Sequence, residues 1–192
     1  MPLNQRIHDQ FHASINTLVD ASDLISEPIA RAAQILTDCF MQEGKILACG
    51  QGISGLAAQH ACGILVNQLE KERPGLAAIV LPDNVAMRDG TELDANTFAR
   101  QISALGQQGD VLLAISTFGL APALIEAARA AQQREMIVIA LVGGEGGALA
   151  EILREEDVLI CAPANSPARI HETFMFAVHA LCDGVDFLLL GA

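Results

Sequence analysis

The chain has 192 residues, of which 52% are hydrophobic and 18% charged, and its formal net charge at pH 7 is −12. This composition excludes an intrinsically disordered chain and supports one domain with a full hydrophobic core. The excess of acidic residues argues against direct binding to a nucleic-acid backbone. The sequence offers no apolar stretch of membrane-spanning length and no apolar segment of a secretory signal near its start. We therefore expect a cytoplasmic protein with no membrane or direct nucleic-acid partner.

The five cysteines form no C-x-x-C pair, and each lies among apolar or small residues. This arrangement favours buried, reduced thiols over a metal or redox role. The cysteines are Cys39, Cys49, Cys62, Cys161 and Cys182.

Residues 4–43 are predicted to form two consecutive helices. Four apolar residues recur at spacings of four, four and three, which places them on one face of a helix. They are Ile7, Phe11, Ile15 and Leu18. Ser26, followed shortly by Pro28, matches the start of a second helix, which we expect to end at Gly44. The extra apolar surface suits an oligomer contact, or packing onto the same domain.

From residue 45 onward, short apolar runs alternate with helical segments. The runs expected to be strands are 46–49, 77–81, 111–116, 136–142 and 158–162. The helices expected to follow them are 54–71, 96–105, 122–134, 147–155 and 167–190. Such alternation indicates a doubly wound parallel sheet covered on both faces. We predict a single domain, 1–192: a flavodoxin-like three-layer α/β/α sandwich with a five-stranded parallel sheet (45–192), preceded by the helical pair (1–44).

The first predicted strand ends in a turn that contains Gly50, Gly52 and Gly55, and a helix begins near Ser54. This arrangement directs backbone N–H groups and the positive end of the helix dipole toward one point, which favours an anion. The turn fits the G-x-G-x-x-G pattern, but no acidic residue ends the next strand about 20 residues on, as a dinucleotide site would require. A glycine turn without a ligand is a second alternative. Ser54 favours a third, a small phosphorylated ligand, because its hydroxyl can join the backbone donors.

Several separate motifs, in order along the chain, resemble those of the sugar isomerase (SIS) family. They are C-G-Q-G-I-S-G at 49–55, G-D-V-L-L-A-I-S-T at 109–117 and A-R-I-H-E at 168–172. More narrowly, nearly the whole chain is similar to the phosphoheptose isomerases and to the DnaA initiator-associating proteins. The resemblance implies the SIS fold, a homotetramer and a phosphorylated sugar as ligand.

The resemblance also assigns residues to the sugar phosphate. In the family, the first turn and an S-T-S-G-N-S turn hold the phosphate through hydroxyls and backbone amides. Gly50, Gly52, Ser54, Ser116 and Thr117 match that pattern. The departures are Phe118, Leu120 and Ala121, which replace Ser, Asn and Ser. Each lost hydrogen bond to a charged phosphate costs about 1.5–3 kcal/mol, so we expect weakened binding.

Two further ligand residues are less clearly matched. Asp89, in the loop M-R-D-G-T-E, fits the family's Asn-Asp loop only with a shift of register. Arg169 matches a family arginine, and a packing or ion-pair role suits it as well as a ligand contact.

Phosphoheptose isomerases move a proton between adjacent carbons, which requires a base and an acid. By resemblance, these are a glutamate one helical turn after His60 and a histidine on the last helix. The histidine is kept as His179, whereas Ile64 occupies the position of the glutamate. Since a hydrocarbon side chain cannot accept a proton, we expect isomerisation by the family mechanism to be lost.

Zinc is the one cofactor that the resemblance suggests, because some members hold it through His, Glu, Gln and His. His60 and His179 match two of these ligands, and His171 replaces the Gln. Three histidines could hold zinc with an open fourth position. However, His171 and His179 lie about 12 Å apart along a continuous helix. The alternative is that these histidines are hydrogen-bonded and line a pocket.

The last helix ends in an apolar segment that bears on protein partners. The initiator-associating proteins use a terminal Leu-Phe pair to engage the replication initiator. Leu189 and Leu190 occupy those places, so the match is partial. Subunit packing is the other interpretation, and we favour it.

Two functions therefore remain open. The first is a regulatory SIS protein that binds a phosphorylated sugar weakly and acts through a protein partner. The second is an active sedoheptulose 7-phosphate isomerase that uses its histidines with a metal. Ile64 separates them, and we favour the first because the base is missing.

Overall fold

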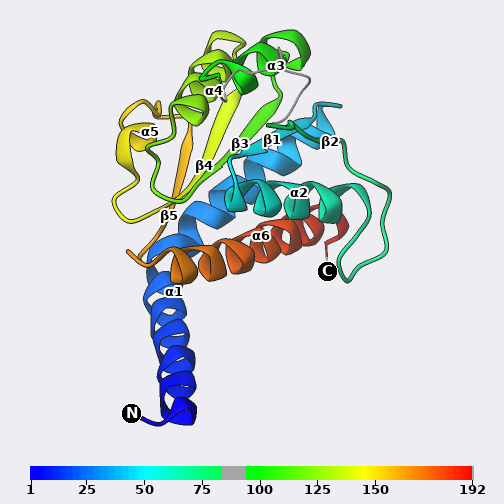
Figure 1. Cartoon of the computed structure of the whole chain (residues 1–192). Coiled ribbons are helices and arrows are strands. Elements are labelled where there is room, and N and C mark those ends of the chain that lie inside the picture. The colour runs from blue at the N-terminus through cyan, green and yellow to red at the C-terminus, as the bar shows by residue number, and fades with distance from the viewer. Residues whose placement is uncertain (84–93, 192) are drawn as a thin grey trace.

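In the computed structural model, which describes residues 1–83 and 94–191, a five-stranded parallel sheet lies between two layers of helices (Figure 1). The strands are β1 (Ile46–Gly50), β2 (Ala78–Val80), β3 (Val111–Ser116), β4 (Ile137–Gly143) and β5 (Val158–Ala162), in the order β2-β1-β3-β4-β5. The helices are α1 (Leu3–Met41), α2 (Ile53–Val66), α3 (Thr97–Leu105), α4 (Pro122–Gln133), α5 (Gly147–Glu151) and α6 (Pro167–Leu190). The predicted three-layer fold is confirmed.

The two faces of the sheet are buried under different helices. Successive side chains of a strand point to opposite faces. In β3, Val111 and Leu113 pack with α1, α2 and α6, whereas Leu112 and Ala114 pack with α3, α4 and α5. Because both faces are covered, the strands are nearly continuous apolar runs.

The N-terminal segment is one helix, so the prediction of a helical pair was wrong. Helix α1 continues through Pro28. The Ser26 hydroxyl donates to the carbonyl four residues earlier and does not cap a new helix. A proline inside a helix costs about 3 kcal/mol, because it removes a backbone donor and crowds the preceding turn. Ile25 and Ile29, on either side, are both buried in the core, and this packing favours the continuous helix.

The two halves of α1 have different surroundings. Residues 21–39 pack against the sheet and α6, whereas residues 3–20, none of which is buried, project away from the domain (Figure 1). The projecting half carries an exposed apolar row at a spacing of four, namely Leu3, Ile7, Phe11, Ile15 and Val19. A subunit contact through this row, as the sequence suggested, stays a prediction.

Helix α6 is long and apolar enough to cross a membrane when judged by length and composition alone. No segment of this kind was expected from the sequence. Nine residues of α6 are buried in the domain, including Phe174, which is fully buried. This burial is what a core helix of a folded domain shows.

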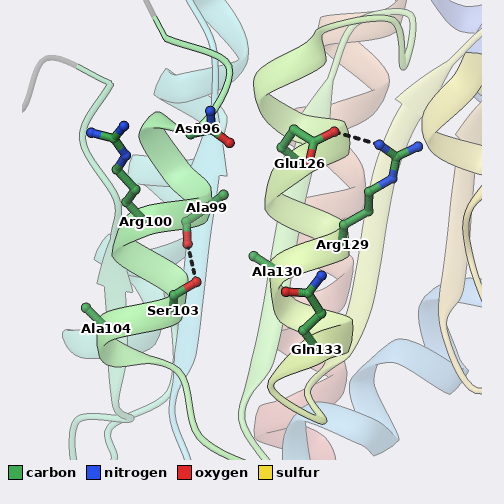
Figure 2. Close-up of a pocket in the computed structure, with 9 residues that line it drawn as sticks. All are labelled: Asn96, Ala99, Arg100, Ser103, Ala104, Glu126, Arg129, Ala130 and Gln133. Carbon is green, nitrogen blue, oxygen red and sulfur yellow. Dashed lines mark hydrogen bonds and ion pairs between the residues drawn. The ribbon is translucent and has the colours of Figure 1, made fainter.

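A hollow of about 540 Å³ lies between α3 and α4. The guanidinium groups of Arg100 and Arg129 border it but point to opposite sides (Figure 2). Each is already paired, with Asp94 at 3.4 Å and with Glu126 at 2.6 Å respectively. The hollow therefore lacks converging donors, and it contains none of the predicted site residues.

A buried aspartate fixes the edge of the sheet at which β3 begins. The Asp110 carboxylate accepts the N–H of Lys45 at 3.0 Å and the N–H of Gln107 at 2.8 Å. The Lys45 ammonium adds an ion pair at 2.6 Å. The side chain thus joins the turn before β3 to the start of the neighbouring strand β1.

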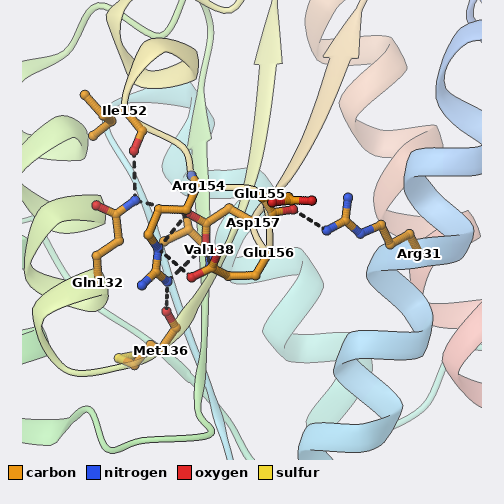
Figure 3. Close-up of polar contacts among 9 residues, drawn as sticks. All are labelled: Arg31, Gln132, Met136, Val138, Ile152, Arg154, Glu155, Glu156 and Asp157. Carbon is orange, nitrogen blue, oxygen red and sulfur yellow. Dashed lines mark hydrogen bonds and ion pairs between the residues drawn. The ribbon is translucent and has the colours of Figure 1, made fainter.

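The same arrangement recurs before β5 (Figure 3). The Asp157 carboxylate accepts the N–H of Val138, in the neighbouring strand β4, and the N–H of Arg154, both at 2.8 Å. The amide of Gln132 contributes a third bond at 3.0 Å. Nearby, Arg31 donates to the carbonyl of Glu155 at 2.6 Å and connects α1 to this edge.

Candidate functional site

The turn after β1 lies at the carboxyl edge of the sheet, where ligands bind in open α/β folds. A Cβ on Gly50 would lie 2.5 Å from the carbonyl oxygen of Ser54, so only glycine permits this close approach. Gly52 has a φ of 59°, which favours glycine. The N–H of Ser54 donates to the Gln51 carbonyl at 3.2 Å and closes the turn. The positive end of α2 faces this edge.

The turns after β1 and β3 together enclose a cavity of about 290 Å³. Gly52 and Ser54 line one side, and Ser116 and Thr117 line the other. The structure therefore brings four predicted ligand residues to one place. The rest of the lining consists of Gln51 and the three apolar departures from the family pattern, Phe118, Leu120 and Ala121.

A chain of polar side chains connects this cavity to α6. Thr117 Oγ1 lies 3.3 Å from Ser54 Oγ and 3.0 Å from His171 Nε2. Ser116 instead supports the turn, because its hydroxyl accepts the N–H of Gly119 at 3.1 Å. Burial lowers the pKa of His171, which favours its neutral form as partner of the threonine hydroxyl.

Further along the same two helices, His60 on α2 meets His179 on α6. Their Nε2 atoms are 2.7 Å apart, and the rings meet edge to face with centroids 5.0 Å apart. One ring must donate and the other accept, so at least one is neutral. Burial lowers the pKa of His60, and the neighbouring His179 lowers it further. The pair therefore contains a base near neutral pH, and both rings are half-buried and reachable from solvent.

The three histidines predicted to hold zinc lie in two groups. His60 and His179 contact each other, whereas His171 is bonded to Thr117. Across residues 1–83 and 94–191, no group of three or more His, Cys, Asp or Glu side chains is arranged to hold a metal ion. With Ile64 in place of a carboxylate, the donors present do not fit the family's zinc set.

Ile64 lies one turn beyond His60 and is 4% exposed within the core between α1, α2 and α6. Beyond it, a buried ion pair joins the end of α2 to α6. The side chains of Arg73 and Asp186 are 2% and 4% exposed, with Nε and Oδ1 2.5 Å apart. Arg73 also donates to the carbonyls of Leu65 at 2.8 Å and Ile64 at 3.1 Å. This pair fixes the spacing of the two helices at which the histidines meet.

The remaining predicted residues have varied surroundings. Arg169 donates to the Gln10 carbonyl at 2.8 Å and to the Ser14 hydroxyl, and thereby connects α6 to the projecting half of α1. Its guanidinium also pairs with Glu172 at 2.8 Å. Asp89 lies outside the described residues. Leu189 packs against the core and Leu190 is 45% exposed. The ligand role of Arg169 and the partner role of the two leucines stay predictions.

The cysteines contribute no reactive group to this site. All five are free, and all but the half-buried Cys161 are buried. Burial raises the pKa of Cys39 to about 11 and the pKa values of Cys62 and Cys182 to about 12. These thiols stay protonated at neutral pH, and their burial agrees with the prediction from the sequence.

Sequence reasoning missed the Arg73–Asp186 pair, although a signal existed. Asp186 is the one charged residue in the stretch 184–190 of the last helix. A lone carboxylate at a core-facing position requires a buried partner. Arg73, just before a Pro-Gly sequence, was a candidate for that partner.

Comparison with known proteins agrees with this architecture. The SIS domain matches residues 10–143, and the chain belongs to the SIS domain family. Within that family it is similar to phosphoheptose isomerases over its full length. It is 47% identical to the phosphoheptose isomerase of Thiobacillus denitrificans, covering 100% of this chain and 98% of that protein. The corresponding protein of an Azoarcus species is 46% identical with the same coverage.

Solved structures give the same result. The phosphoheptose isomerase GmhA of Neisseria gonorrhoeae has a TM-score of 0.88 and 38% identity, covering 96% of this chain and 99% of that chain. A phosphoheptose isomerase of Francisella tularensis has a TM-score of 0.90 and 37% identity, covering 97% and 99%. These similarities agree with the resemblance that the sequence motifs indicated.

Proposed function

We propose that this protein is a phosphosugar isomerase of the phosphoheptose isomerase type, acting on a phosphorylated seven-carbon sugar such as sedoheptulose 7-phosphate. The observation that carries the proposal is the His60–His179 contact, in a chain 47% identical over its whole length to a phosphoheptose isomerase. The names of the relatives favour this activity over the regulatory role that the sequence analysis preferred.

The substrate phosphate would bind in the cavity between the turns after β1 and β3. The hydroxyls of Ser54 and Thr117 and the positive end of α2 would stabilise its charge. His60 follows Ser54 by six residues, which is about 9 Å along the helix. An extended sugar phosphate is of comparable length, so its carbonyl end would reach the histidine pair.

The histidine pair would then carry the proton transfer. A neutral imidazole can take the proton from the carbon next to the carbonyl, while the second imidazole donates a proton to the carbonyl oxygen. The enediol becomes an aldose when the first proton returns to the former carbonyl carbon and the hydroxyl on the carbon that gave up that proton loses its own proton to form the aldehyde. The two rings thus replace the carboxylate and histidine of the family. No step requires a metal, and none is assigned to His60, His171 and His179, because their arrangement does not fit the family's zinc set.

Turnover of sedoheptulose 7-phosphate by the full chain tests this proposal. The protein is incubated with the sugar phosphate in the presence of zinc or of a chelator, and the aldose product is measured. We expect turnover in the parent and its loss in His179→Gln. Addition of a carboxylate by Ile64→Glu tests whether position 64 limits the rate. Thermal stabilisation by the sugar phosphate without any turnover would contradict the proposal.

That contradictory result would support the second candidate, a regulatory SIS protein. Ile64 is the observation in its favour, because the family base is absent and buried hydrocarbon replaces it. Such a protein would act in the cytoplasm as a homotetramer, with the projecting half of α1 in a subunit contact. A partner of the replication-initiator type would bind at Leu189 and Leu190. Loss of partner capture in Leu190→Ala, with the oligomer intact, would favour this role.

A further inference from the structure

We infer that His8 and His12, on the projecting half of α1, form a binding site for a late first-row divalent cation such as Cu²⁺, Ni²⁺ or Zn²⁺. This site is separate from the carboxyl edge of the sheet and does not depend on the proposed isomerase activity. Imidazole nitrogen is a preferred ligand of these ions.

The geometry of the two rings matches a metal chelate. Residues four apart lie on one face of a helix. The Nε2 atoms of His8 and His12 are 3.2 Å apart, and the ring centroids are 4.3 Å apart. Two nitrogens that each lie 2.0–2.1 Å from a tetrahedral zinc are about 3.3 Å from each other. An ion can therefore replace the proton shared by the two rings without a change in the helix.

The histidine pair of the candidate site is different in this respect. The Nε2 atoms of His60 and His179 are 2.7 Å apart, which is hydrogen-bond distance and too short for a tetrahedral ion between them. An ion there would require the two helices or the two rings to move. His8 and His12 need no such rearrangement.

The surroundings of His8 and His12 leave room for the remaining ligands. Both residues are exposed, and none of residues 3–20 is buried. The nearby Asp9 carboxylate accepts a bond from the Gln5 amide at 2.8 Å. Since the described residues hold no three-donor metal group, water would complete the coordination. The net charge of −12 favours the approach of a cation.

Binding would stabilise the part of α1 that lacks core packing. The described contacts of this half with the rest of the domain include the bonds from Arg169 to Gln10 and Ser14. A metal bridge between residues four apart holds one turn of helix closed. The ion would therefore protect the backbone of the projecting half against local opening.

Calorimetric titration of the full chain with Ni²⁺ tests the inference. The His60→Gln/His179→Gln variant serves as background, so that the other histidine pair cannot contribute. We expect one ion per chain in this background, and loss of that ion when His8→Gln or His12→Gln is added. Asp9→Asn is the matched control on the same turn and should keep the ion. Across metals, affinity should follow Cu²⁺ above Ni²⁺, with Zn²⁺ below Cu²⁺.

A second measurement covers the effect on the helix. Amide hydrogen exchange of residues 3–20 should slow on addition of Zn²⁺ in the same background, and not in the variant that also lacks His8. Equal ion binding with and without His8 and His12 would overturn the inference. So would ion binding that leaves exchange in this segment unchanged.

Discussion

The two edges of the sheet are built from different interactions. At the edge where β3 and β5 begin, Asp110 and Asp157 are buried, and each accepts two backbone N–H groups at 2.8–3.0 Å. At the opposite edge, Ser54, Thr117 and His171 form a chain with distances of 3.0–3.3 Å. The first edge is held by charge-assisted bonds in the interior, and the second by neutral bonds around a cavity.

Because of this difference, we expect the first edge to contribute mainly to the stability of the fold and the second edge mainly to the reaction. Bonds between a buried carboxylate and backbone N–H groups are costly to break, so the first edge fixes the strand register. Neutral bonds around the cavity can be exchanged for bonds to a ligand at little net cost. Variants at the first edge should therefore affect folding, and variants at the second edge and at the histidine pair should affect the reaction.

The largest effect is expected at the histidine pair. His179→Gln removes a proton-transfer group, which contributes about 10²–10⁴-fold to catalysis. Turnover of sedoheptulose 7-phosphate should fall by that factor, while the melting temperature changes little because the ring is half-buried. Kinetics of the parent and the variant, with a melting curve for each, provide the measurement. A large drop in melting temperature would instead assign His179 a structural role.

The next effect is expected at the opposite edge. Asp157→Ala leaves the N–H groups of Val138 and Arg154 without their acceptor, and we expect the free energy of unfolding to fall by about 3–5 kcal/mol. Denaturant unfolding measures the change. Glu156→Ala is the matched control, because its exposed ion pair with Arg154 contributes about 0–1 kcal/mol. If both variants lose the same stability, the buried carboxylate has no special role.

A smaller effect is expected in the phosphate cavity. Ser54→Ala removes one hydroxyl that would bond the phosphate, at a cost of about 1.5–3 kcal/mol in binding. Titration with sedoheptulose 7-phosphate should show roughly 10–150-fold weaker affinity. Ser103→Ala, on α3, removes a hydroxyl that bonds the Ala99 carbonyl and should leave the affinity unchanged (Figure 2). Equal affinity in all three proteins would contradict the assignment of the cavity.

Much of the fold follows from local pattern. The apolar runs and their breakers predicted β3, β5 and α6 to the residue, since strands covered on both faces leave little ambiguity. The end of α2 could not be predicted, because Arg73 reaches back from outside the helix and binds its last carbonyls. The continuity of α1 through Pro28 likewise depends on packing against distant residues.

The candidate site was only partly predictable. The glycine turn after β1 predicts an anion site by itself, because the geometry of such a turn is local. His60 and His179 are 119 residues apart in the sequence, so only the family resemblance marked both as candidate site residues. His8 and His12, by contrast, have a spacing of four that is visible in the sequence. The pair was not singled out because neither histidine belongs to a motif of the family resemblance.

The smallest effect is expected in the pH dependence. Burial, with a further contribution from His179, lowers the pKa of His60 in the fold, so the folded state favours the neutral ring. This contribution to stability is complete above the ordinary pKa of about 6.5 and is lost as the pH falls from there through the pKa of the folded state. The unfolding free energy of the parent should therefore decrease more steeply below pH 6.5 than that of His60→Gln. Parallel curves for the two proteins would mean that the fold does not favour the neutral ring. The value of kcat/KM should decrease over the same pH range, because the neutral imidazole is the base.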